Sequence, residues 1–207
     1  MIKVIDYKAG NAPSVMHAIN RLGHNAVFAR QGDELADAAY ILLPGVGSAG
    51  ATMESLRELN MIVALKDAVL KRKTFFLGIC VGMQILFQHS EEDNADCLGW
   101  LKGNVTKFDA SKMRVPQMGW NKVNFTESPV SDASGGKAKM EGYFYFVNSY
   151  YAKPVNVEDL WGTADYNGQF AAAVHRDNIY ATQFHVEKSG KAGLAILDGF
   201  LKLGKRD

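Results

Sequence analysis

The segment that most constrains this chain is residues 75–84, an apolar stretch that contains the pattern Gly78-Ile79-Cys80-Val81-Gly82. A buried strand is predicted to enter this turn, and a helix over 83–88 is predicted to leave it. Glycines on both sides let neighbouring backbone approach closely, so a strained turn can hold the sulfur at the end of the strand. A helix N-terminus beside the thiol favours the thiolate. A cysteine in an apolar run is more often a packed core residue, but this context favours a nucleophile at Cys80.

A second segment, residues 183–189, offers a base and a carboxylate. Strand alternation would place His185 and Glu187 on one face, two residues apart. Taken alone, His185 could equally be a solvated histidine near a sheet edge. Cysteine, histidine and glutamate together are the groups that nucleophilic acyl transfer needs. We therefore expect Cys80, His185 and Glu187 to form a catalytic triad, whereas Cys97 lacks such a context and is expected to be structural.

The first half of the chain alternates strands with helices. Strands are predicted at 2–5, 25–29, 40–43 and 74–79, and helices from Asn11 to near Gly23, over 33–38, and within 51–73 with a break near Asn60. This alternation predicts an α/β fold with a doubly wound, mostly parallel sheet. Ligands bind at the carboxyl ends of such strands. Asp6, the 44–47 loop and Cys80 should therefore share one rim.

The second half is denser in strands, which predicts an antiparallel extension of the sheet. Strands are expected at 104–108, 122–125, 143–147, 160–166, 171–175 and 179–184. A surface loop is expected over 131–139, and a final helix over 191–203 with Ser189 as its cap. We find no internal repeat and no linker, so one domain over residues 1–207 is expected.

The loop Pro44-Gly45-Val46-Gly47 is a candidate oxyanion loop. One oxyanion donor would be the Val81 backbone N–H, directly after the nucleophile, and the second would be an N–H near Val46. Flanking glycines would make rotation of that peptide easy. No Lys-Ser/Thr pair follows the loop, so it is not a phosphate cradle. No cluster of side chains has metal-ligand spacing, and no metal site is predicted.

Charge and cysteine content limit the partners and the compartment. The chain has 23 Lys and Arg against 22 Asp and Glu, a net charge of +1, so neither nucleic acid nor a membrane surface is indicated. No apolar stretch approaches the roughly 20 residues of a membrane span. Two cysteines are too few for a disulfide framework, and a reactive Cys80 suits a reducing compartment. A cytoplasmic protein is expected.

Seven segments together resemble the class I (triad-type) glutamine amidotransferases, and within that class the glutaminase subunits of imidazole glycerol phosphate synthase. They span almost the whole chain in family order: 6–7 with 9–11, 43–47, 78–84, 90–92, 116 with 118–121, 145–147 with 149–150, and 183–185 with 187–189. The Gly-x-Cys-x-Gly turn over residues 78–82, which we call the elbow, and the His-x-Glu pattern of His185 and Glu187 mark the class. The Pro-Gly-Val-Gly and Met-Gly-Trp-Asn runs point to the subfamily. The resemblance implies a flavodoxin-like sheet.

The resemblance also implies roles for further residues. Cys80 would be the nucleophile, His185 the base and acid, and Glu187 the residue that orients it. Gln84 and Glu92 would hold the α-amino and α-carboxylate end of glutamine, with help from backbone near Ser149 and Tyr150.

The implied partner is a (β/α)₈-barrel cyclase that forms a heterodimer with this chain and makes imidazole glycerol phosphate and AICAR. The residues expected to face it are Asn11, Gln117 and Lys188. No metal or organic cofactor is implied.

Four positions depart from the subfamily pattern. Lys8 replaces a glycine, Gln117 and Asn148 each replace a histidine, and Val186 replaces a proline. None removes a member of the triad. Three alternatives stay open: a glutaminase of the same class that feeds another synthase, for example one that amidates a surface sugar; a stand-alone cysteine hydrolase; and a non-catalytic regulatory subunit, which the intact triad disfavours.

Overall fold

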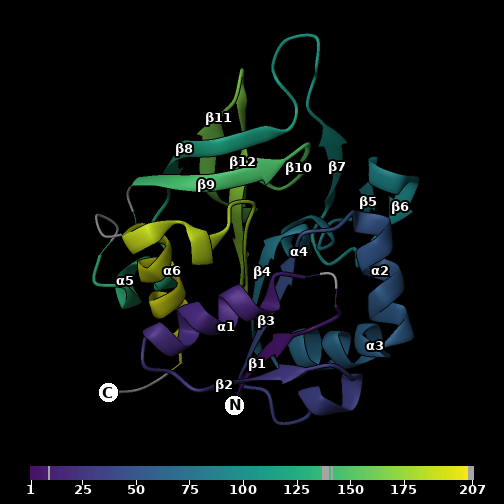
Figure 1. The fold of residues 1–207 in the computed structure, drawn as a ribbon, viewed down its shortest axis with the longest axis vertical. Coiled ribbons are helices and arrows are strands. Elements are labelled where there is room, and N and C mark those ends of the chain that lie inside the picture. Colours follow the sequence, from purple (N-terminus) through teal and green to yellow (C-terminus); the bar gives the residue numbers. More distant parts are fainter. Residues whose placement is uncertain (9, 137–139, 141, 205–207) are drawn as a thin grey trace.

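A nine-stranded mixed sheet runs through the protein in the order β2-β1-β3-β4-β13-β12-β11-β8-β9 (Figure 1). The structure is a computed structural model that describes residues 1–8, 10–136, 140 and 142–204. Ala9 of the N-terminal matched segment and residues 137–139 of the predicted surface loop lie outside the described residues. The large mixed sheet confirms the predicted α/β fold class.

The parallel part of this sheet contains the strands at whose carboxyl ends the site was expected. Its strands are β1 (Ile2–Ile5), β2 (Ala26–Ala29), β3 (Tyr40–Gly45), β4 (Phe75–Cys80) and β13 (Ile179–Thr182), and every pairing among these five is parallel. β1, β3 and β13 are buried along their whole length, which is why they are mostly apolar in the sequence, with Lys3 and Thr182 as buried exceptions. The order of the five strands is that of flavodoxin-like sheets.

The antiparallel part continues from β13. It consists of β12 (Gln169–Arg176), β11 (Leu160–Asp165), β8 (Gln117–Phe125) and β9 (Gly142–Asn148). β8 begins five residues before the strand predicted at 122–125, so the Met-Gly-Trp-Asn run forms part of a strand. The predicted antiparallel extension is therefore present and longer than expected.

Helices flank the strands on both sides. Figure 1 shows α1 (Ala12–Arg21) and α6 (Gly190–Lys202) on one side, and α2 (Ala49–Glu58) and α3 (Met61–Lys66) on the other. Asn60 separates α2 from α3 with a φ of 54°, which confirms the predicted break. α3 runs into a π turn at Asp67–Lys71, and a short helix, α5 (Pro129–Ala133), packs against α6. None of the helices in the described ranges combines the length and the apolar character that a membrane crossing requires.

A second, four-stranded sheet has the order β10-β7-β5-β6. Its strands are β10 (Tyr150–Pro154), β7 (Gly103–Lys107), β5 (His89–Ser90) and β6 (Ala95–Asp96). Only β7 was predicted. β5 and β6 are two residues long, too short to show a period in the sequence, and the five-residue β10 was missed. This sheet brings Tyr150 and the 3₁₀ turn at Glu92–Asn94 to the carboxyl end of β4.

Two predicted helices are wrong in extent. The helix expected over 83–88 is α4 (Val81–Gln84), which is one turn long. The carbonyls of Ile85, Leu86 and Phe87 accept hydrogen bonds from residues 98, 101 and 99 instead of continuing the helix. The helix expected over 33–38 is a 3₁₀ turn at Gly32–Leu35. In the first case, tertiary hydrogen bonds replace the local ones that a helix would make.

Candidate active site

Cys80 occupies a strained turn between β4 and α4. Its φ of 57° and ψ of −108° lie outside the regions that non-glycine residues ordinarily adopt. The flanking glycines are required by close approach: a Cβ on Gly82 would lie 2.0 Å from the Leu43 oxygen, and one on Gly78 would lie 2.4 Å from the Gly82 oxygen. The predicted elbow is therefore present, with one turn of helix beginning directly after the cysteine.

His185 and Glu187 form a buried pair next to this cysteine. His185 Nδ1 lies 2.9 Å from Glu187 Oε1, and only 2% of His185 is exposed. Burial opposes the charged imidazole, but hydrogen bonds to the Cys80 sulfur and to Glu187 outweigh it and raise the pKa of His185 to about 9. Burial likewise opposes the charged carboxylate, yet the hydrogen bond from His185 lowers the pKa of Glu187 below its usual value. The pair is thus an imidazolium and a carboxylate at neutral pH.

The expectation that strand alternation would pair His185 with Glu187 is wrong. β13 ends at Thr182, so His185 and Glu187 do not lie on a strand. His185 precedes a 3₁₀ turn at Val186–Lys188, and its backbone N–H donates to Tyr145 O at 3.0 Å. The turn, and not strand alternation, brings the carboxylate back to the imidazole.

Ser189 does not cap the final helix with its side chain. Its Oγ donates to His185 O at 2.6 Å and accepts from the Tyr145 N–H at 3.0 Å. Ser189 therefore ties the segment of His185 to β9.

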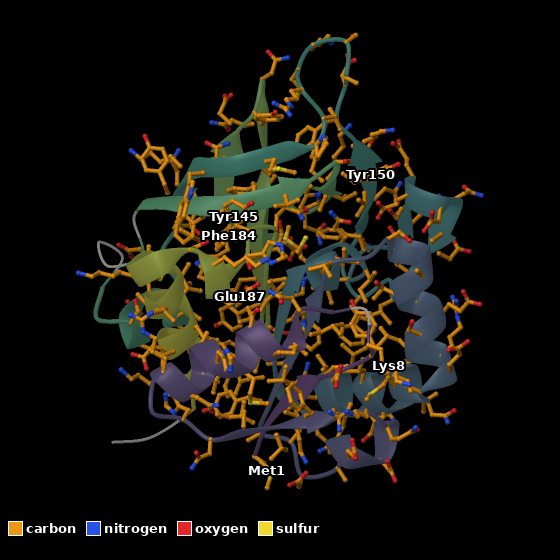
Figure 2. All side chains as sticks on the ribbon, viewed as in Figure 1. Met1, Lys8, Tyr145, Tyr150, Phe184 and Glu187 are labelled. Atoms are coloured by element: carbon orange, nitrogen blue, oxygen red, sulfur yellow. The ribbon has the colours of Figure 1, made fainter. Side chains whose placement is uncertain are left out.

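Asn11, which was expected to face the partner, lies beside the pair and is half-exposed. It precedes α1 as predicted, but its side chain makes no capping bond. Its Nδ2 donates to Glu187 Oε1 at 2.9 Å, and its Oδ1 accepts from Ser14 Oγ at 2.7 Å. Figure 2 shows Glu187 next to the beginning of α1, below Tyr145 and Phe184. Sequence reasoning missed this contact because 176 positions separate the two residues.

A pocket of about 400 Å³ opens over the cysteine and gathers most of the predicted residues. Its lining includes Val46, Cys80, Val81, Gln84, Glu92, Ser149, Tyr150, His185 and Lys188. Glu187 and Asn11 lie behind His185, outside this lining. Among the described residues, no group of three or more His, Cys, Asp or Glu side chains could hold a metal ion.

The predicted oxyanion loop begins at the end of β3, where Gly45 is paired with Cys80 across the sheet. A Cβ on Gly45 would lie 2.7 Å from Tyr7 Oη and 2.9 Å from Val81 Cβ, so this position is closely packed. Beside Gly47, the nearest atom would be 4.0 Å away. A side chain is therefore excluded at Gly45 by close packing, whereas the space beside Gly47 is open.

Of the residues expected to bind the substrate's α-carbon groups, Gln84 ends α4 and Glu92 begins the 3₁₀ turn at Glu92–Asn94. Gln84 Nε2 donates to Tyr150 O and to Gln183 Oε1, both at 3.0 Å, so both of its amide hydrogens are used. Glu92 Oε2 accepts from the Ala49 N–H at 3.0 Å, at the beginning of α2, and burial raises the pKa of this carboxyl group. Gln84 could therefore meet a ligand through its oxygen, and Glu92 through its remaining carboxylate oxygen.

Gln117 cannot face a partner in this structure, because only 3% of it is exposed. It is paired with Asn148 across β8 and β9, so two departures from the family pattern meet on the inner face of the sheet. Gln117 Oε1 and Asn148 Oδ1 are both buried without a hydrogen-bond partner. Strand alternation instead exposes Met118 and Trp120 on the outer face.

The other two departures are accommodated by the backbone. Lys8 has a φ of 68°, in the left-handed region where the family's glycine would be unstrained. Val186 is fully buried in the turn between His185 and Glu187. Neither change displaces the buried pair.

Comparison with known proteins identifies similar sequences over the whole length. The family model described as glutamine amidotransferase class-I matches residues 3–203. The imidazole glycerol phosphate synthase subunit HisH 2 of Methanococcus maripaludis is 38% identical over 204 residues, which cover 98% of this chain and 99% of that protein. The HisH subunit of Methanocaldococcus jannaschii is 41% identical over 206 residues, with 98% and 100% covered. That of Neisseria meningitidis serogroup B is 41% identical over 212 residues, with 96% and 97% covered.

Two solved structures share the fold. One, described as a glutamine amidotransferase, has a TM-score of 0.76 at 16% identity and covers 98% of this chain and 97% of its own. The other is PurLQS from Thermotoga maritima, with a TM-score of 0.78 at 17% identity and coverage of 99% and 98%. At this identity the likeness concerns the fold alone.

Proposed function

Because the chain belongs to the class I glutamine amidotransferases, among the HisH subunits of imidazole glycerol phosphate synthase, we propose that it hydrolyses glutamine and supplies ammonia for histidine biosynthesis. The observation that carries the proposal is the strained Cys80 turn in one pocket with His185, which Glu187 contacts from behind. A cysteine held at a strand end beside an imidazolium is the arrangement that nucleophilic acyl transfer requires.

The proposed reaction begins with attack of the Cys80 thiolate on the side-chain amide carbon of glutamine. The C–S bond forms, and the carbonyl electron pair moves to oxygen, where N–H groups of Val81 and the Val46 loop stabilise it. The His185 imidazolium protonates the nitrogen, the C–N bond breaks, and ammonia leaves a thioester. His185 then takes a proton from water, which attacks the thioester carbon. The C–S bond breaks, and glutamate and the thiolate are released.

Glu187 acts in this scheme as the residue that orients His185. Its lowered pKa keeps it ionised throughout, so it stabilises the imidazolium without carrying a proton itself. Glu92, in the same pocket, would hold the α-ammonium group of glutamine, and Gln84 Oε1 with backbone near Ser149 and Tyr150 would complete that end. The reaction needs no metal or organic cofactor.

The ammonia is proposed to pass to a (β/α)₈-barrel cyclase that forms a heterodimer with this chain. In water most ammonia becomes ammonium, which is not a nucleophile, so it has to be delivered directly. Met118, Trp120 and Tyr143 are 66%, 57% and 62% exposed on the outer face of β8 and β9. Val147, on the same face, lines the pocket. An exposed patch of methionine and aromatic side chains beside the pocket supports docking of the cyclase there.

Lys188, which is exposed at the rim of the pocket, would contact the same partner. We further propose that the whole chain is one amidotransferase domain and that it works in the cytoplasm. Its two cysteines are both free, as a reducing compartment would keep them.

Covalent labelling tests the nucleophile. A diazo-ketone analogue of glutamine should modify Cys80, and Cys80→Ala should lose both the labelling and the glutaminase activity. Modification of Cys97 together with retained activity in Cys80→Ala would refute the assignment.

Rate measurements with and without the cyclase test the partner. One missing oxyanion donor costs about 100- to 1000-fold in rate. If the cyclase completes the oxyanion site through the Val46 loop, glutamine hydrolysis should rise by about that factor when cyclase and a ligand of its active site are added. Equal rates with and without the cyclase would favour a stand-alone cysteine hydrolase, and stimulation by a different synthase would reassign the pathway.

A further inference from the structure

A chain of buried amides ends on the Cys80 sulfur. Gln183 is fully buried, and its Nε2 lies 3.6 Å from Cys80 Sγ. Its Oε1 accepts from Gln84 Nε2 at 3.0 Å, and Gln84 Nε2 also donates to the backbone oxygen of Tyr150 at 3.0 Å. Three hydrogen bonds therefore connect a backbone carbonyl of β10 with the nucleophile.

The backbone oxygen of Tyr150 determines which groups donate and which accept in this series of hydrogen bonds. A backbone carbonyl can only accept hydrogen bonds, so the Gln84 amide must turn its nitrogen toward Tyr150. The same nitrogen donates its second hydrogen to Gln183, which must then present its oxygen to Gln84. The Gln183 nitrogen is left facing the sulfur, so the amide group acts there as a donor and not as an acceptor.

The backbone holds Gln183 in this position. Thr182, the last residue of β13, is paired with Ile79 of β4, so Gln183, which follows β13, lies beside Cys80, the last residue of β4. The Gln183 N–H donates to Ala172 O at 2.8 Å, which secures the main chain on its other side. Because the side chain has no exposed surface, water cannot replace it as a donor to the sulfur.

From this geometry we propose that Gln183 is a further catalytic residue of the glutaminase site, which donates a hydrogen bond to the Cys80 thiolate. The inference rests on the proposed function. A thiolate accepts a hydrogen bond more strongly than a thiol, so the contact favours the reactive form. It also holds the sulfur while His185 turns its proton to the leaving nitrogen. His185 can then serve as an acid without being the only group that keeps the thiolate in place.

Alkylation of Cys80 tests the proposal without glutamine. The titratable groups that face the sulfur are His185 and Tyr7, and Gln183 does not titrate. In the full chain, Gln183→Met keeps the size of the side chain and removes the donor. Iodoacetamide should modify Cys80 in this variant about tenfold more slowly at neutral pH, near the lower end for a hydrogen bond to an ionised group. The half-maximal rate should move to higher pH.

Two controls separate this effect from general damage. Asn178→Leu removes another buried amide just before β13, where it bridges Val69 O and Thr74 O, and should leave the alkylation of Cys80 unchanged. Peptide mapping separates Cys80 from Cys97, in which burial raises the thiol pKa to about 11. If Gln183→Met does not fold, Gln183→Glu keeps the shape but places an oxygen against the sulfur, and the profile should move in the same direction.

An unchanged pH profile in a folded Gln183→Met or Gln183→Glu variant would overturn the proposal. Because alkylation does not depend on glutamine, the two ideas can fail separately. A wild-type chain without glutaminase activity, whose Gln183 variants still alkylate slowly, would refute the proposed function and support the hydrogen bond. Normal glutaminase activity of the wild type, together with an unchanged alkylation profile in the Gln183 variants, would support the proposed function and refute the hydrogen bond.

Discussion

Asn11 donates a hydrogen bond to Glu187 Oε1 at 2.9 Å, and His185 Nδ1 contacts the same oxygen at 2.9 Å. The other oxygen, Glu187 Oε2, is buried without a hydrogen-bond partner. The carboxylate is therefore held by one oxygen only, between an imidazole and an amide. We therefore propose that Asn11, in the loop that follows β1, positions Glu187 in the proposed triad.

Replacing Asn11 with alanine should lower the glutaminase kcat. A hydrogen bond to a charged group contributes about 1.5–3 kcal/mol, so a tenfold or larger loss is expected, with little change in the KM for glutamine. Asn20→Ala, at an exposed position in the α1 helix that follows Asn11, is the matched control. Steady-state kinetics in the presence of the partner would measure both variants. A raised KM with unchanged kcat would instead assign Asn11 to binding.

Glu187→Gln should be more severe, because it removes the charge that stabilises the His185 imidazolium. Loss of one triad member typically costs several orders of magnitude in rate. We expect kcat to fall by that amount while the KM for glutamine changes little. The measurement is glutamine turnover at saturating substrate, and a large KM increase with preserved kcat would make Glu187 a binding residue.

The raised pKa of His185 predicts a pH-dependent stability. The folded-state pKa of about 9 lies above the ordinary value of 6.5, so the folded protein binds this proton more tightly than the unfolded chain does. The stabilisation is fully present below about pH 6.5 and is lost as the pH rises through about 9. Urea unfolding of the wild type and of His185→Gln at pH 6 and at pH 9.5 should show a stability difference that shrinks at the higher pH. A difference that stays constant would mean that His185 is not protonated in the fold.

Two glycines beside Val46 should respond differently to alanine. Gly45→Ala places a Cβ 2.7 Å from Tyr7 Oη and 2.9 Å from Val81 Cβ, and should destabilise the fold by about 1–3 kcal/mol. Gly47→Ala meets its nearest atom at 4.0 Å and should change stability by less than about 0.5 kcal/mol. Thermal or urea melts of the two variants provide the comparison. Equal losses would contradict the close packing at Gly45.

The sequence by itself indicated four of the five parallel strands, the elbow and the residues that we propose as the triad; the fifth parallel strand, β13, was expected in the antiparallel extension. These features have local signals in the sequence: apolar runs mark buried strands, and glycines stand two positions before and after Cys80. The close approach of Gly82 to the Leu43 oxygen, in contrast, is a tertiary contact. Parallel strands of such a sheet end at the same edge, so the sequence predicted that Cys80 and the Val46 loop lie close together.

Only the tertiary structure decided how the triad is supported. His185 and Glu187 meet through a 3₁₀ turn after β13, and not through strand alternation. The helix after Cys80 stops at Gln84 because distant N–H groups take the next carbonyls. Amide side chains such as Asn11, Gln117 and Gln183 have no local signature of their partners, since strand register and burial determine which group each one meets. The contacts that hold Glu187 and the Cys80 sulfur therefore come from residues far away in the sequence.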